Sequence, residues 1–183
     1  MKDNEEITLL VNKLRKLQID SYNGLPEELF LFISSMVPIP NIDLWITNDK
    51  NQILLSWRDD EYYGKGWHFP GGCIRYGETM MERVQKTALE EVGTHVVVQS
   101  EKPIAIKDVI RGENDKQMYK KERGHNITIL FKCRLPEQFE IDNKEKKQTD
   151  RGYLKWFDDV PDNILKVHAV YNEIFKEWKD KGI

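Results

Sequence analysis

The chain has 183 residues, of which 39% are hydrophobic and 32% are charged, and its formal net charge is -3. This length suits one domain with a sizeable core plus an added arm, and the composition is typical of a globular protein rather than a disordered one. The balance of charge argues against a general nucleic-acid-binding protein, and no apolar run approaches the ~20 residues that a membrane span needs. We therefore expect a cytoplasmic protein that binds neither nucleic acid nor a membrane.

The first part of the chain, residues 1–36, predicts a helical arm. Apolar residues recur at helical spacing from Ile7 to Leu17, and the run LPEELFLFISSM opens with a proline near a first helical turn. Two amphipathic helices must bury their apolar faces on the domain or on a partner chain. We expect a homodimer that uses this arm, followed by the main domain at residues 37–183.

The rest of the chain predicts a mixed α/β domain. The β-prone runs IDLWIT and QILLSWR are separated by the turn signal NDKN, which predicts a hairpin-like pair of strands. A helix is predicted from about Glu78 to Val92, where Gly93 stops it. Further strands are predicted at THVVVQS, PIAIKDVI, HNITILFKCRL and YLKWF, and a closing helix from about Pro161 to Trp178. Because strands and helices are interspersed, we expect helices packed on a sheet within one domain.

The helix at 78–92 carries two adjacent carboxylates near its end. Helical periodicity places four apolar residues on one side, where they should be buried: Met81, Val84, Ala88 and Val92. Glu91 lies nearest the edge of that side and Glu90 lies farther out, so Glu91 should be the more shielded of the two. Both could be ordinary solvent-facing glutamates, which is the usual role of such a pair.

A glycine loop in front of the helix favours a binding site instead. Pro70, Gly71 and Gly72 allow a tight turn with no side chains in the way, so that a carbonyl can point at a metal or an amide at a phosphate. A carbonyl oxygen, a helix carboxylate and diphosphate oxygens together suit Mg²⁺. The loop and the helix therefore predict a site for a metal and a diphosphate.

The same residues resemble a known family. The spacing from Gly72 to Glu78, the distance on to Glu90 and Glu91, and the final Gly93 resemble the Nudix box, and WHFPGG before it strengthens the match. The wider likeness, over roughly residues 40–175, is greatest to the GDP-mannose mannosyl hydrolase branch. It implies an α/β/α sandwich that binds Mg²⁺, or Mn²⁺ in its place, and hydrolyses a nucleotide sugar or a related nucleoside diphosphate compound. The implied metal ligands are the Gly71 carbonyl, Glu90 and Glu91.

Two departures from the family pattern concern catalysis. Lys86 and Thr87 stand where the box usually has an arginine and a glutamate, and the branch also lacks that glutamate. Where the branch has a glutamine and a histidine, this chain has Asp150 and Arg151, and a guanidinium has no acceptor with which to act as a base. We expect Asp150 and Glu90 as catalytic candidates, with Asp150 or Glu145 a base only if burial raises its pKa. We expect water to attack the sugar carbon rather than phosphorus. The alternative is a binding or regulatory module with little turnover.

Three residues outside the box are candidates for binding the substrate, each with a structural alternative. Arg58 follows a predicted strand and matches a substrate-contacting arginine of the branch, but a surface role at a strand end suits it equally. Asp43 matches an aspartate of the branch and could instead be a hydrogen-bonded structural residue. Trp67, in the glycine-rich stretch DDEYYGKGW, could stack on a base or sugar or could close the core. His168, in the last helix, is expected to be structural.

Overall fold

The computed structural model describes residues 2–110 and 125–181. Its helices are α1 (Lys2–Lys16), η1 (Ser21–Asn23), α2 (Glu27–Ser34), α3 (Met80–Glu91), η2 (Lys166–Tyr171) and α4 (Asn172–Lys181). Its strands are β1 (Ile39–Ile46), β2 (Ile53–Asp60), β3 (Gly64–His68), β4 (Gly71–Cys73), β5 (Val97–Val98), β6 (Ala105–Ile110), β7 (His125–Arg134) and β8 (Leu154–Phe157). The polar stretch GENDKQMYKKERG that precedes β7, residues 112–124, lies outside the described residues.

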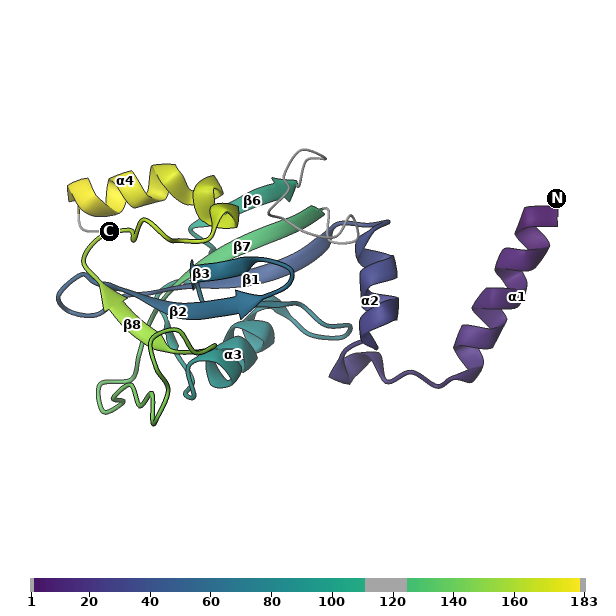
Figure 1. The fold of residues 1–183 in the computed structure, drawn as a ribbon, viewed down its shortest axis with the longest axis horizontal. Coiled ribbons are helices and arrows are strands. Elements are labelled where there is room, and N and C mark those ends of the chain that lie inside the picture. Colours follow the sequence, from purple (N-terminus) through teal and green to yellow (C-terminus); the bar gives the residue numbers. More distant parts are fainter. Residues whose placement is uncertain (1, 111–124, 182–183) are drawn as a thin grey trace.

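The strands form two sheets, and the first of them is mixed. In this sheet β1 pairs antiparallel with β4 and parallel with β7, while β5 and β6 both pair antiparallel with β7. The second sheet is antiparallel, in the order β3-β2-β8. Helix α3 lies on one side of the sheets and α4 on the other (Figure 1). The predicted α/β fold, a sandwich with a mixed sheet and N-terminal helices, is confirmed.

The expected pairing of the first two strands was wrong. β1 and β2 belong to different sheets and meet only at the isolated bridge between Thr47 and Ile53. β1 has β4 along one edge and β7 along the other, and its residues from Ile42 to Ile46 are buried. The chain after the turn therefore continues into the second sheet, where β2 pairs with β3 and β8.

The glycine-rich stretch that was expected to be a loop contains two strands, β3 and β4. In β3, Trp67 packs in an aromatic core, and a Cβ on Gly66 would lie 2.5 Å from the Asn163 carbonyl oxygen. The strand is therefore built around a close backbone approach, and the glycines hide the alternating pattern that identifies a half-buried strand. β5 is much shorter than predicted, and the closing helix starts as the 3₁₀ segment η2 rather than at Pro161.

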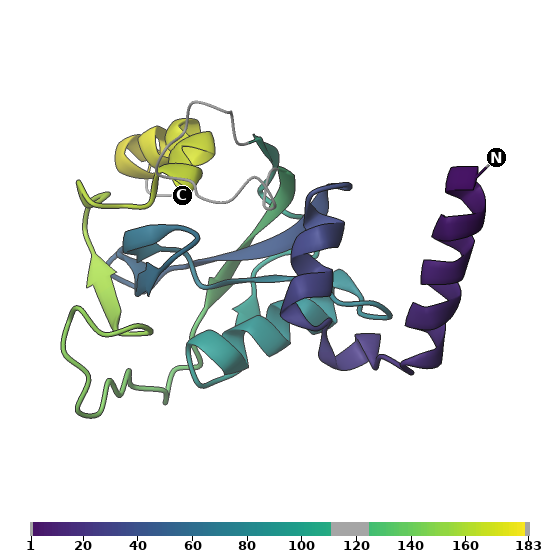
Figure 2. The same cartoon turned by 45° about the vertical axis from the view of Figure 1, so that its right-hand side comes forward.

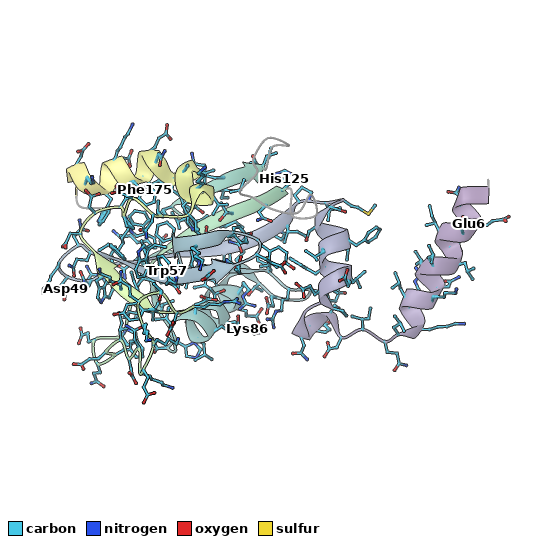
Figure 3. All side chains as sticks on the ribbon, in the orientation of Figure 1. Glu6, Asp49, Trp57, Lys86, His125 and Phe175 are labelled. Atoms are coloured by element: carbon cyan, nitrogen blue, oxygen red, sulfur yellow. The ribbon has the colours of Figure 1, made fainter. Side chains whose placement is uncertain are left out.

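Two hydrophobic clusters hold the layers together. In the first, Val84 and Ala88 of α3 are fully buried against residues of β1 and β7. In the second, Trp45 and Trp67 pack with Phe175 and Trp178 of α4. Figure 3 shows Phe175 and Trp57 within the body of the protein, and Glu6 on a helix that stands apart from it. The domain thus buries apolar side chains on both sides of its sheets.

The N-terminal helices differ in their contact with the domain. α2 buries Leu31 and Ser34, and its Glu27 accepts a hydrogen bond from the Tyr62 hydroxyl of the β2–β3 turn. α1 stands away from the domain in two views (Figures 1 and 2). Its apolar residues, Ile7, Leu10 and Leu14 among them, are exposed. Among the described residues, none of the helices combines the length and apolar character of a membrane span. The division at residue 36 stays a prediction, because α2 packs on the domain that follows it.

Candidate active site

Helix α3 begins at a capping box. The Thr79 hydroxyl accepts a hydrogen bond from the Glu82 N–H, and the Glu82 carboxylate accepts one from the Thr79 N–H at 2.7 Å. These bonds satisfy backbone donors that the first helical turn leaves without partners, and so they fix where the helix starts. The register of the helix then determines which of its glutamates face the domain.

The structure places Glu90 and Glu91 differently, in the order that periodicity predicts. The Glu90 side chain is 48% exposed and forms ion pairs with Arg83 and, at 3.7 Å, with Arg75. Glu91 is half-buried and, within the described part of the chain, makes no ion pair. Burial raises the pKa of the Glu91 carboxyl, and the charges of Arg58 and Arg151 oppose that rise. Glu91 is therefore a shielded carboxylate that faces cationic side chains.

Gly71 and Gly72 lie where the backbone must pass close to other groups. A Cβ on Gly71 would be 2.5 Å from Asp43 Oδ1, and one on Gly72 would be 2.9 Å from Thr87 Oγ1. Only glycine leaves room for both approaches. The two residues bring the backbone of β4 against Asp43 on β1 and against helix α3.

A small polar pocket lies beside Gly71, with a cavity volume of about 60 Å³. Residues from both sheets and from η2 line it, including Asp43, Arg58, His68, Asn126 and His168. The structure thus brings two of the three predicted substrate contacts, Asp43 and Arg58, into one pocket with a predicted metal ligand.

Asp43 is the centre of a hydrogen-bond network as well as a pocket residue. It is 6% exposed, and its Oδ2 accepts hydrogen bonds from Thr128 Oγ1 at 2.6 Å and from the Tyr171 hydroxyl at 2.8 Å. Asn41 Nδ2 donates to Oδ1 at 2.9 Å. A buried carboxylate requires such partners, and here they tie β1, β7 and η2 together. Asp43 therefore also has the hydrogen-bonded structural role that the sequence left open for it.

Arg58 is tethered within the site. Its Nε donates to Asp60, and its guanidinium lies 4.2 Å from the centre of the Tyr63 ring. Its charge opposes the rise of the Glu91 pKa and contributes to the lowering of the His68 pKa. A planar guanidinium held in this way is suited to phosphate oxygens.

Two histidines lie in the pocket without having been predicted as site residues. His68 follows the core residue Trp67 on β3, so its side chain points to the opposite face, which Arg58 shares. Burial and the charge of Arg58 hold the pKa of His68 well below 6.5. Burial also lowers the pKa of His168, whose Nε2 accepts a hydrogen bond from the Phe69 N–H at 3.4 Å. The sequence signal for His68 is weak, because the glycines of β3 hide the alternation that would place it on this face.

Two predicted site residues lie elsewhere. Trp67 is 2% exposed and packs against Trp57 and Phe157, so its ring belongs to the core and cannot stack on a ligand. Asp150 is exposed and its carboxylate accepts the Lys147 N–H at 2.8 Å, within a surface turn. Asp150 therefore lacks the burial that it would need to act as a base. Arg151, next to it, does face Glu91 and His68 electrostatically.

A larger groove lies between the arm and the Nudix-like box, with a volume of about 340 Å³. Leu25, Phe30 and Ile33 of the arm form its apolar wall, and Arg75 and Gly72 belong to its other side. Ligand pockets usually have volumes of about 300–1,000 Å³, so this groove reaches that range whereas the pocket beside Gly71 does not.

The residues present meet part of the requirement for a divalent ion. Among the described residues, no three histidine, cysteine, aspartate or glutamate side chains converge on one point. Mg²⁺ is commonly held by one or two carboxylates plus water and substrate phosphates, so it does not need such a cluster. Glu91 fits this description, whereas Glu90 is already paired with two arginines.

The family model of the NUDIX domain matches residues 37–170. This match covers most of the chain, together with the box helix and the glycine loop described above. The chain therefore belongs to the Nudix family.

Individual relatives are distant. The low-salt glycan biosynthesis protein Agl8 of Haloferax volcanii is 30% identical over 76 residues, which are 42% of this chain and 48% of that protein. The chain thus spans about half the length of this curated relative. The fold resembles that of a UDP-X diphosphatase, with a TM-score of 0.53 and 20% identity over 97% of this chain and 80% of that one. It also resembles MutT protein from Methanosarcina mazei Go1, with a TM-score of 0.53 and 18% identity over 80% of this chain and 97% of that one. These likenesses establish the fold and do not distinguish one Nudix branch from another.

Proposed function

We propose that the protein is a Mg²⁺-dependent hydrolase of a nucleotide sugar similar to GDP-mannose, or of a related nucleoside diphosphate compound. The observation that carries this proposal is the half-buried carboxylate of Glu91 on the box helix, whose charge interacts with those of Arg58 and Arg151. A carboxylate can hold the metal, and guanidinium groups can bind the diphosphate oxygens that the metal also contacts. Membership of the Nudix family and the position of Glu91 in the box support the same assignment.

The metal, when bound, neutralises the diphosphate and improves it as a leaving group. Glu91 and the Gly71 carbonyl are the groups proposed to hold it, and Mn²⁺ would suit the same oxygen ligands. Arg58 orients the diphosphate through a guanidinium that Asp60 and Tyr63 keep in place. Asp43 and His68 line the adjoining polar pocket, where they can contact the hydroxyl groups of a sugar.

We propose attack at the anomeric carbon of the sugar rather than at phosphorus. Thr87 replaces the box glutamate that attack at phosphorus often uses as a base, and its hydroxyl already accepts a hydrogen bond from Arg83 at 3.0 Å. Hydrolysis in isotopically labelled water distinguishes the two routes. Label in the released sugar supports attack at carbon, whereas label in the nucleotide or the sugar phosphate contradicts it.

A second candidate is a binding or regulatory module with little turnover. It is favoured by the surface position of Asp150, which removes one candidate base. The experiment that separates the two is a turnover screen of nucleotide sugars and nucleoside diphosphate compounds in Mg²⁺, with calorimetric binding measured for the same ligands. Turnover that stops in chelator supports the hydrolase, and binding without turnover across the panel supports the module.

We also propose that the arm binds a second copy of this chain. The exposed side of α1 carries Ile7, Leu10 and Leu14, which are 57%, 58% and 41% exposed. The same helix is acidic near its start, at Glu5 and Glu6, and basic in its last turn, at Lys13, Arg15 and Lys16. Two such helices packed antiparallel cover the apolar side chains and bring the acidic half of each beside the basic half of the other.

A further inference from the structure

Arg83 is a buried charged side chain within the box helix. It is 1% exposed and is the one lysine or arginine that is buried among the residues the structure describes. A guanidinium loses its hydration on burial and requires hydrogen bonds and opposite charge in compensation. The surroundings of Arg83 provide both.

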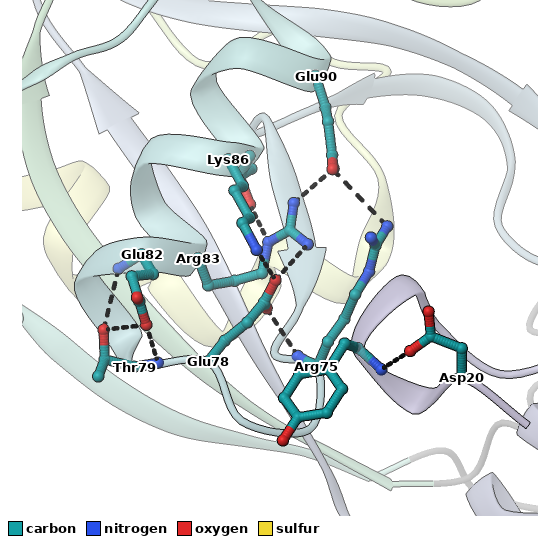
Figure 4. A network of polar contacts seen from close by, with 10 residues as sticks. Asp20, Arg75, Glu78, Thr79, Glu82, Arg83, Lys86 and Glu90 are labelled. Atoms are coloured by element: carbon teal, nitrogen blue, oxygen red, sulfur yellow. Dashed lines mark hydrogen bonds and ion pairs between the residues drawn. The ribbon is translucent and has the colours of Figure 1, made fainter.

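The partners of Arg83 are residues of the same box (Figure 4). Its Nε donates to Thr87 Oγ1 at 3.0 Å, and a terminal nitrogen donates to Glu90 Oε2. The other terminal nitrogen lies 3.7 Å from Glu78 Oε1, whose carboxylate also pairs with Lys86 at 3.0 Å. The side chains at positions 83, 87 and 90 share one helix face, because they are separated by four and three residues.

The guanidinium lies directly between the helix and the glycine loop. A Cβ built on Gly72 would be 3.5 Å from Arg83 Nε and 2.9 Å from Thr87 Oγ1. A metal that joined the loop backbone to Glu90 would have to lie in this same gap.

The charge of the network also opposes a second cation. Arg75, Arg83 and Lys86 form ion pairs with the two carboxylates Glu78 and Glu90. Both carboxylates are therefore already paired with cationic side chains before any ion binds. A divalent cation placed between Glu90 and Thr87 would meet the Arg83 guanidinium at close range and would be repelled by it.

We propose that Arg83 is a built-in cation that occupies the Glu90 side of the Nudix box and excludes a divalent ion from it, so that metal binding is confined to the Glu91 side. Thr87 belongs to the same arrangement, because its hydroxyl accepts a hydrogen bond from Arg83 where a glutamate would add a third carboxylate. Glu90 is then a partner of Arg83 rather than a metal ligand. Arg83 acts as a positioning residue that determines where the ion binds.

The inference rests on the proposed function only in that Glu91 binds the ion, and it is tested by binding of Mn²⁺ to the purified full chain. Stoichiometry and affinity are measured by electron paramagnetic resonance, together with thermal unfolding of each variant. Glu90→Gln is expected to unfold at a lower temperature and to keep Mn²⁺ affinity within about twofold of the wild type, whereas Glu91→Gln loses about tenfold or more. Equal loss of affinity in both variants overturns the proposal.

A second variant is designed to create an additional metal site on the Glu90 side of the box. Arg83→Gln combined with Thr87→Glu removes the guanidinium and adds the third carboxylate, and the folded protein is expected to bind one more Mn²⁺ per chain than the wild type does. Unchanged stoichiometry in the folded double variant overturns the proposal. Wild type that binds no Mn²⁺ while the double variant does would contradict the proposed metal dependence and still support the role of Arg83.

Discussion

Helices α3 and α1 differ in which kinds of side chain they bury and expose. In α3 the charged residue Arg83 is buried, and every polar atom of its network comes from the same domain. In α1 the apolar residues Ile7 and Leu10 are more than half exposed, although their spacing is that of a buried helix face. The comparison shows that the polar groups of α3 are satisfied within the chain, whereas the apolar side of α1 is left exposed, which is why we propose that it binds a partner.

The largest effect is expected from removing that partner surface. Deletion of residues 1–18 removes α1 and should convert the protein from dimer to monomer, because the apolar stripe no longer exists. Analytical ultracentrifugation at micromolar concentration measures the mass. Leu10→Asp with Leu14→Asp should do the same without deletion, whereas Asn12→Asp, on the other side of the helix, should leave the dimer intact. A wild type that is monomeric at this concentration would contradict the proposal that α1 binds a second copy of the chain.

The next largest effect is expected from changing Glu91, the glutamate that is not paired with Arg83. Glu91→Gln should lower Mg²⁺-dependent turnover roughly 100-fold or more, because the metal loses its main side-chain ligand. Glu90→Gln is the matched control, with the same chemical change one residue away, and is expected to retain most of the turnover. Steady-state kinetics over a range of Mg²⁺ concentrations measures both. Equal losses would show that the two glutamates act together on the metal.

Removal of the buried guanidinium is expected to reduce stability. Arg83→Met should lower the free energy of unfolding by about 3 kcal/mol, because Glu78 and Thr87 lose their buried partner. Arg15→Met in α1 is the control, and a surface change of this kind should stay within about 0.5 kcal/mol in the monomeric range of concentration. Urea unfolding followed by fluorescence of the core tryptophans measures both variants. Equal losses would indicate that α1 is as firmly integrated as α3.

The smallest effect is expected from pH. Burial lowers the pKa of His68 and of His168 below 6.5, so the unfolded chain binds protons that the folded chain does not. Stability should be complete above pH 6.5 and should fall as the pH drops below it, by about 1 kcal/mol or more. His68→Asn should flatten this dependence, and the exposed His95→Asn should not. An unchanged slope in His68→Asn would contradict the burial of a neutral imidazole in the pocket.

The sequence predicted those features that depend on local spacing. Periodicity located α3 and ranked the shielding of Glu90 and Glu91, because helix register decides both. Periodicity also places Arg83, Thr87 and Glu90 on one sector of the helix, but it did not predict that the guanidinium is buried and paired there. Its burial depends on the approach of Gly72, which is a tertiary contact.

Other features depended on partners distant in the chain. β3 was not predicted because Gly64 and Gly66 hide its alternation, and Gly66 is needed only because the backbone at Asn163 comes close. Trp67 and Asp150 were candidates for the site because the sequence does not show burial, and the structure places the tryptophan in the core and the carboxylate at the surface. The local sequence pattern determines the register of a helix or strand, whereas the packing of other elements determines which of its side chains are buried.

The most direct test of the account is a turnover assay of the wild type and Glu91→Gln on a panel of nucleotide sugars, with GDP-mannose included, in Mg²⁺ and in chelator. The account predicts that the wild type hydrolyses at least one of these compounds, that chelator stops the reaction, and that Glu91→Gln is strongly impaired while still folded. Absence of turnover across the panel, with calorimetric binding of the same compounds, would contradict the hydrolase and would establish a binding module.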